Sequence, residues 1–283
     1  MENMHADIDR KITQKQRSPQ DIHSNKQKQK QKPKGSPVWT SSKQSISYIT
    51  VSGIQSDTSW QEFEWPKLVM KELISNAWDA LNDYYPHGTK ENRKISVCVK
   101  IDYMLDDDNR RTIIRIAVRN SNLDNTPVFE NLSQIFDYKQ FHSTKRHQHR
   151  EVSGALGDFL KRGLGMGYAS WTEGYDRERK DSAVADKQWT EPIVFRHNNF
   201  EDKVFIHVNW DEQEYWPVFS DRISYNVPDF TEVEITLPLD SILRKNSDLR
   251  ISWVLTDLQK YFQRNKIGKT NTDFSFDIEK GDL

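Results

Sequence analysis

The sequence has little of several features that mark particular classes of protein. One cysteine among 283 residues excludes a disulfide framework and a zinc site built on several cysteines, and it fits a reducing compartment. No run of about 18 apolar residues is present, which excludes a transmembrane helix. The polar N-terminus lacks the apolar core of a secretory signal peptide. We therefore expect a cytoplasmic protein, free or associated with the nucleoid, with no membrane partner.

Apolar residues are also scarce, at 35% of the chain against about 45–50% in an average domain, a figure that includes glycine. Aromatic residues are plentiful at 11%, so we expect a real core that a polar segment dilutes. The length suits one large domain or two small ones, at roughly 100–200 residues per domain.

The formal net charge of −1 hides an uneven distribution. Residues 1–45 carry a net charge of +6, so residues 46–283 carry −7. The stretch KQKQKQKPKG, from Lys26 to Gly35, has almost nothing to bury and does not offset its ordering entropy. We expect a disordered basic tail over residues 1–45 and a folded domain over residues 46–283. The tail is either a solubilising segment or an arm that binds DNA through phosphate contacts.

Periodic patterns predict helices and strands along the rest of the chain. Trp65 to Tyr85 forms the strongest helical pattern, and Pro86 stops it. Lys94 to Tyr103 and Arg111 to Asn120 alternate apolar and polar residues, which predicts a hairpin with its turn at residues 106–109. We expect three more strands, over Glu191 to Arg196, Lys203 to Trp210 and Thr231 to Leu237. A loop that opens a helix is expected over Ser153 to Ala169, and a last helix over Ser247 to Arg264. This order favours an α+β fold, with one sheet covered by helices on one face.

The first helix carries polar residues along the edge of its apolar face. At about 100° per residue, Glu72, Asn76 and Asp79 lie within about 60° of one another. They flank the apolar positions Val69, Leu73, Ala77 and Ala80. Such a row either lines the wall of a pocket or forms the ordinary polar border of an amphipathic helix.

The pattern Glu72-x-x-x-Asn76-x-x-Asp79-Ala80 resembles the N-box of the GHKL ATPase superfamily, in particular that of the ATPase domain of topoisomerase VI. The resemblance implies a Bergerat-type ATP-binding fold, a two-layer α/β sandwich with a mixed sheet covered by helices on one face. It implies ATP and Mg²⁺ as cofactors, Glu72 as the general base, Asn76 as the Mg²⁺ ligand and Asp79 near the nucleotide. An amide oxygen suits Mg²⁺, and a carboxylate one turn away can orient the attacking water.

A second motif departs from the family pattern. Where the family has D-x-G-x-G after a strand, this chain has Asn120-Ser121-Asn122-Leu123-Asp124. Asn120 holds the position of the aspartate that reads the adenine amino group, and both glycines are missing. An asparagine oxygen accepts a hydrogen bond from that amino group, but the side chain is neutral. The other interpretation is a divergent loop that has lost nucleotide binding.

Two further regions resemble the family. Ser143-Thr144-Lys145 is similar to the short element before the ATP lid, and Gly154 and Gly157 match the glycines of the lid. Lys145 and Lys161 would then neutralise phosphate charge, beside backbone N–H groups at a helix N-terminus. Thr231, in the strand that closes the fold, would support the residue at position 120 through a hydrogen bond. The alternative for the glycine region is an ordinary turn, and the alternative for the strand of Thr231 is a strand with no role in binding.

Two clusters are interpreted as surface. His142, His147 and His149 lie in a basic loop, where no cysteine or carboxylate stands at ligand spacing. Ser170 to Gln188 is charged and poor in apolar residues, which predicts an exposed insertion or a mobile lid.

The expected function is that of an ATP-driven switch in a DNA-topology or DNA-processing complex. The resemblance implies a nucleotide-dependent homodimer. Because few residues follow the predicted ATPase core, we expect a protein that works with a DNA-cleaving or DNA-binding partner. Two alternatives stay open: a nucleotide-dependent interaction module with little hydrolysis, and a chaperone-like protein.

Overall fold

A computed structural model of the chain describes residues 38–39, 43–85, 87–106, 109–121, 136, 159–176, 193–197, 200–224, 230–245, 250–266, 269 and 271–280. All of them belong to one compact unit, Pro37–Leu283. Residues 1–36 lie outside the described part, so the disorder of the tail stays a prediction.

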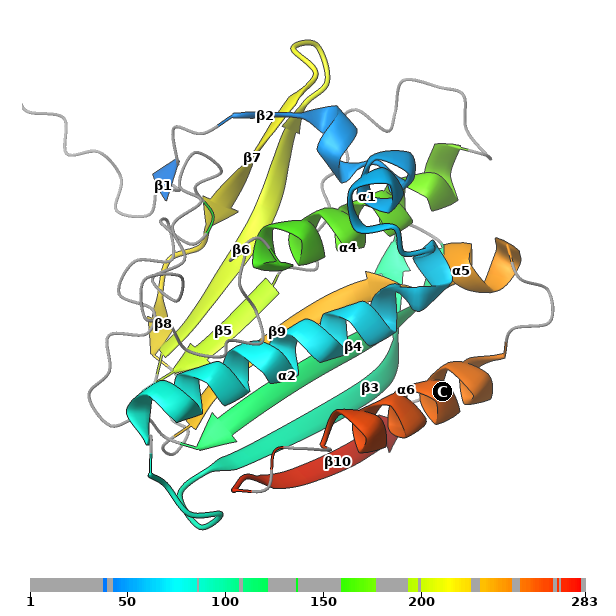
Figure 1. Cartoon of the computed structure of the whole chain (residues 1–283). Helices are drawn as coiled ribbons and strands as arrows, with labels where there is room; N and C mark the ends of the chain where they lie inside the picture. Colours follow the sequence, from blue (N-terminus) through cyan, green and yellow to red (C-terminus); the bar gives the residue numbers. More distant parts are fainter. Residues whose placement is uncertain are drawn as a thin grey trace, which may run out of the picture. The chain divides into compact units, whose positions relative to one another are not determined.

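The described strands form one mixed sheet (Figure 1). Their order is β1-β7-β6-β5-β9-β4-β3-β10, with β2 beside β7 and β8 beside β6. Among the described pairs, β10 and β3 run parallel and the others antiparallel. The strands are β1 Val38–Trp39, β2 Gln44–Ser45, β3 Lys94–Asp106, β4 Asn109–Ser121, β5 Ile193–His197, β6 Phe200–Asn209, β7 Glu214–Phe219, β8 Ile223–Ser224, β9 Phe230–Pro238 and β10 Asp273–Lys280.

Helices cover one face of this sheet. Helix α2 contacts β3, β4 and β9, α4 contacts β6 and β9, and α6 contacts α2 and β10. Figure 1 shows α2 lying across the sheet between α4 and α6. The helices are α1 Val51–Thr58, α2 Trp65–Tyr84, α4 Phe159–Asp176, α5 Asp240–Lys245 and α6 Ile251–Asn265, with short 3₁₀ turns η1 Ile46–Ile49 and η2 Glu62–Glu64. The expected mixed α+β architecture is confirmed. None of the described helices is both long and apolar enough to cross a membrane.

The core lies between the sheet and α2, as the strand pattern predicts. The alternating side chains of β3 face the helices and are almost fully buried, at 0–1% exposed: Ile95, Val97, Val99 and Ile101. Because side chains alternate between the two faces of a strand, the residues between them face the other side. Helix α2 ends at Tyr84, one residue before the predicted end, and the hairpin strands run as far as Asp106 and Asn109.

Helix α4 confirms one expectation and corrects another. The helix expected within Ser153 to Ala169 is present from Phe159 onward, and its Gly165 serves packing, since a Cβ there would lie 3.1 Å from Ile49 Cγ2. The predicted exposed insertion after Ser170 is wrong over its first residues. Ser170 and Trp171 are buried at 1% and 2% exposure, because the helical apolar spacing continues through Trp171. Residues 177–188 lie outside the described part.

Several elements have no counterpart in the expectations from sequence. They include α1, α5, β7, β8 and β10, together with two short strands inside the predicted tail: Val38–Trp39 and Gln44–Ser45. Both short strands pair with β7, so the folded domain begins before Ile46. The predicted boundary at residue 45 is therefore too late.

Candidate functional site

The polar row on α2 lies at the border of the buried face, as its spacing predicts. Asp79 is buried at 4% exposure, while Glu72 and Asn76 are half-buried. Lys71 Nζ lies 3.1 Å from Glu72 Oε1, which leaves Glu72 Oε2 without a hydrogen bond to the described residues. One carboxylate oxygen and one amide oxygen therefore lie a single helical turn apart, accessible enough to meet a ligand.

A second polar row crosses the ends of three strands on the same covered face. Asn120 on β4 pairs with Thr231 on β9, and Thr231 pairs with His197 on β5. Asn120 and Thr231 are buried at 5% and 4% exposure. The next row along these strands is apolar: Val118, Val233 and Phe195. The covered face therefore changes from apolar to polar where these strands end.

The hydrogen bonds of this row differ from the expected ones. The Thr231 hydroxyl does not bond to Asn120; its Oγ1 lies 2.9 Å from His197 Nδ1. Asn120 Nδ2 donates to the carbonyl oxygen of Ser121 at 3.3 Å. The predicted neighbours are together, but His197 is an additional member that no motif in the sequence marks.

The four elements that carry the predicted residues meet on one part of the sheet. Helix α2 contacts β4, β9 and α4, and α4 also contacts β9. Lys161, in the first turn of α4, is buried at 4% exposure and is not a surface amine. Lys145, Gly154 and Gly157 lie outside the described residues, as do the histidines at 142, 147 and 149.

A lysine from the segment after α6 approaches the C-terminal half of α2. Lys269 Nζ lies 5.6 Å from the centre of the Trp78 ring and donates to the carbonyl oxygen of Asn265 at 3.0 Å. Burial lowers the pKa of Lys269, and the charge of Asp79 acts in the opposite direction. Asp79 and Lys269 therefore share one charged environment, which sequence spacing did not reveal.

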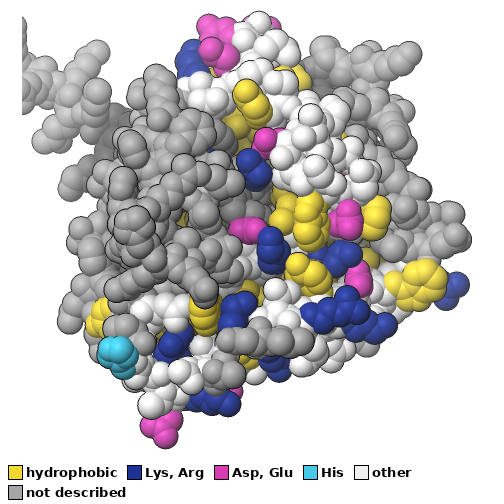
Figure 2. All heavy atoms as spheres, viewed as in Figure 1, with side chains coloured by type: hydrophobic (Ala, Val, Ile, Leu, Met, Phe, Trp, Pro, Cys, Tyr) yellow, Lys and Arg dark blue, Asp and Glu magenta, His cyan; other side chains and the backbone are white. Residues whose placement is uncertain are grey.

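The surface over α2 and α6 is mixed in character. Figure 2 shows Lys and Arg side chains gathered there among hydrophobic ones. Lys67 Nζ of α2 pairs with Asp257 of α6 at 3.0 Å, and Lys266 Nζ lies 4.9 Å from the Phe262 ring centre. The ion pair between Lys67 and Asp257 ties α6 to α2.

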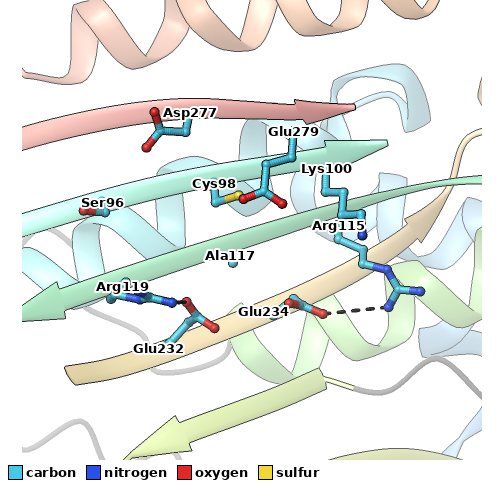
Figure 3. Close-up of a pocket in the computed structure, with 10 residues that line it drawn as sticks. All are labelled: Ser96, Cys98, Lys100, Arg115, Ala117, Arg119, Glu232, Glu234, Asp277 and Glu279. Atoms are coloured by element: carbon cyan, nitrogen blue, oxygen red, sulfur yellow. Dashed lines mark hydrogen bonds and ion pairs between the residues drawn. The ribbon is translucent and has the colours of Figure 1, made fainter. Parts of the chain in front are cut away.

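A hollow of about 360 Å³ lies on the other face of the sheet, away from the predicted residues (Figure 3). Its lining comes from β3, β4, β9 and β10: Ser96, Cys98, Lys100, Arg115, Ala117, Arg119, Glu232, Glu234, Asp277 and Glu279. Arg196 Nη1 links this lining to β5, since it lies 2.6 Å from Glu232 and 3.2 Å from Glu234. Arg119 also pairs with Glu232 at 2.8 Å. The hollow is an ion-paired sheet surface rather than the predicted site.

Cys98 lines this hollow and is a poor nucleophile. Burial, followed by the carboxylates of Glu279, Glu232 and Asp277, raises its pKa to about 12. Thiol reactivity follows the thiolate fraction, so catalysis by Cys98 is not supported. Among the described residues, no group of three or more His, Cys, Asp or Glu side chains is placed to hold a metal ion.

Comparison with known protein families finds no match, and comparison with characterised proteins finds no significant relative. The geometry of the covered face and the motif resemblance are therefore what bears on function.

Proposed function

We propose that the protein binds ATP with Mg²⁺ on the helix-covered face of the sheet and acts as a GHKL-type nucleotide switch. The observation that carries the proposal is that helix α2, which bears one polar row, packs on strands β4 and β9, whose ends bear the other. A nucleotide bound between these rows would meet polar side chains that can exchange their present partners for ligand atoms.

The side-chain oxygens of Asn76 and Glu72 on α2 suit a site for Mg²⁺ and a nucleotide. Asn76 offers a neutral oxygen, which suits Mg²⁺ that keeps waters and substrate phosphates as its other ligands. Bound Mg²⁺ would supply positive charge to the phosphates. Glu72, one turn earlier, would orient the attacking water through Oε2, while Lys71 holds Oε1. Asn120 and Thr231 would then face the base.

The wider proposal extends the same resemblance. The sheet and helices would form a Bergerat-type fold, in which Gly154 and Gly157 belong to a lid that γ-phosphate contacts order. Lys145 would serve the phosphates with the lid. The protein would act in a DNA-topology or DNA-processing complex, beside a DNA-cleaving or DNA-binding protein, with DNA contact through the basic tail and nucleotide-dependent dimerisation.

The second candidate is a nucleotide-dependent interaction module with little or no hydrolysis, including a chaperone-like protein. Two observations favour it: Asn120 replaces the expected aspartate, and Lys71 already pairs with the proposed base. The Lys71 ammonium already occupies one of the two carboxylate oxygens with which Glu72 would orient a water.

Phosphate release from the full chain separates these candidates. We expect Glu72→Gln to bind Mg-ATP with wild-type affinity and to lose at least about 100-fold in rate, as general bases typically contribute 10²–10⁴-fold. Glu91→Gln, an exposed carboxylate between α2 and β3, is the matched control and keeps the wild-type rate. Equal rates in wild type and Glu72→Gln, with binding retained, would favour the interaction module.

A further inference from the structure

The row of Asn120, Thr231 and His197 has a specific hydrogen-bonding arrangement that extends the proposed nucleotide site. We build on that proposed function and ask which hydrogen bonds these residues would make to the nucleotide base. The three residues are direct cross-strand neighbours, so their side chains lie side by side on the covered face. Two of them are almost fully buried, which keeps bulk water from replacing a missing partner.

The amide of Asn120 has a defined orientation. A backbone carbonyl only accepts hydrogen bonds, so the bond to the Ser121 oxygen at 3.3 Å requires Nδ2 on that side. Oδ1 is then turned away from Ser121 as a hydrogen-bond acceptor. In this orientation Asn120 presents to a ligand the same kind of atom as the carboxylate that it replaces.

The Thr231 hydroxyl has one proton, and His197 decides where it points. If Nδ1 of the ring lacks a proton, the hydroxyl must donate to it and offers a ligand only lone pairs. If Nδ1 carries the proton, the ring donates to Oγ1, across the 2.9 Å separation, and the hydroxyl proton is available to a ligand. The tautomer of His197 therefore sets whether Thr231 can donate a hydrogen bond to a ligand or can only accept one from it.

We propose that His197 is a positioning residue that holds Nδ1–H toward Thr231, so that Thr231 donates to the base while Asn120 Oδ1 accepts from it. This pair of roles matches a 6-aminopurine, whose amino group donates and whose ring N1 accepts. A 6-oxopurine presents the reverse pattern, an oxygen acceptor and an N1–H donor, and is mismatched at both positions. His197 thus determines selectivity for adenine nucleotides without touching the base.

The test compares binding of ATP and inosine triphosphate to the full chain by calorimetry. Wild type is expected to prefer ATP. His197→Leu removes the ring donor and should weaken ATP binding about tenfold with little change for inosine triphosphate. His197→Asn places an amide near the former Nδ1 and should restore most of the preference, which a merely structural role would not predict. His87→Leu, at an exposed histidine, is the control and should change neither affinity.

Nitrogen NMR of the His197 ring gives an independent reading that needs no variant. The proposal requires a protonated Nδ1 in the ATP complex. A ring protonated at Nε2 alone, or equal losses for both nucleotides in His197→Leu with no rescue by asparagine, would overturn the role of His197 while leaving nucleotide binding intact. Wild-type protein that binds neither nucleotide would overturn the proposed function as well.

Discussion

Among single residues, Cys98 shows how the uncovered face of the sheet changes side-chain chemistry. Burial and the nearby carboxylates of Glu279, Glu232 and Asp277 raise the pKa of its thiol to about 12. A thiol of ordinary pKa, near 8.5, is partly ionised at pH 8, whereas this one is almost entirely protonated. The only cysteine of the chain is therefore a reporter of the charge around the hollow.

We predict slow alkylation of Cys98 in the folded protein. At pH 8, N-ethylmaleimide should react at least about 100-fold more slowly than in the same protein unfolded in urea. Glu279→Gln should speed the folded-state reaction, because removing a carboxylate lowers the thiol pKa. Glu212→Gln, at an exposed carboxylate paired with Lys43, is the control and should leave the rate unchanged. Folded and unfolded rates that agree would contradict this description of Cys98.

The raised pKa of Cys98 also makes the free energy of unfolding depend on pH. Because the thiol pKa is higher in the folded state than in the unfolded state, Cys98 favours folding most below about pH 9. That contribution is lost as the pH rises toward 12. Cys98→Ser should flatten this alkaline part of the stability curve, measured by urea unfolding.

Spacing along the sequence predicts some residues of the candidate site but not all of them. Glu72, Asn76 and Asp79 could be placed from helical spacing alone, since three polar positions beside an apolar stripe have only one arrangement. His197 could not, because its role depends on the pairing of β5 with β9. That pairing joins His197 to Thr231, two residues far apart in the chain, and no local pattern records it.

At the scale of elements, tertiary packing explains the helices and strands that local patterns miss. Helix α1 has the sequence VSGIQSDT, which is rich in weak helix formers, yet Val51 and Ile54 are buried against the core. Strand β7 contains Pro217, which usually argues against an inner strand. The described pairings place β1 opposite residues 218–219 and β2 opposite residues 214–215, so Pro217 pairs with β6 on one side and lies between the two short strands on the other.

The junction of η1 and α1 provides a prediction about stability. A Cβ at Gly53 would overlap the carbonyl oxygen of Ser47, and backbone atoms yield less easily than flexible side chains. Gly53→Ala should therefore lower the free energy of unfolding by about 1–3 kcal/mol, despite the better helix propensity of alanine.

Urea unfolding measures this effect, with Ser56→Ala as the control on the exposed side of the same helix. We expect the control to stay within about 0.5 kcal/mol of wild type. A Gly53→Ala variant as stable as wild type would show that η1 and α1 are packed differently.

At the scale of the whole molecule, the two faces of the sheet have different chemistry. The covered face carries the buried apolar core and the polar row of Asn120, Thr231 and His197, whereas the uncovered face carries a network of ion pairs centred on Arg196. The periodic patterns of β3 and β4 predicted this division, because an alternating strand has one buried and one solvated face. They did not predict the ion pairs, which depend on the order of strands in the sheet.

Calorimetric titration of the full chain with Mg-ATP tests the central claim most directly. We expect wild type to bind, and Asn76→Ala to bind at least about fivefold more weakly in Mg²⁺ but almost equally in EDTA, because Asn76 acts through the ion. Asn92→Ala, at an exposed position after α2, should match wild type under both conditions. The proposed nucleotide site is contradicted if wild type does not bind at millimolar ATP, or if Asn76→Ala binds Mg-ATP as tightly as wild type.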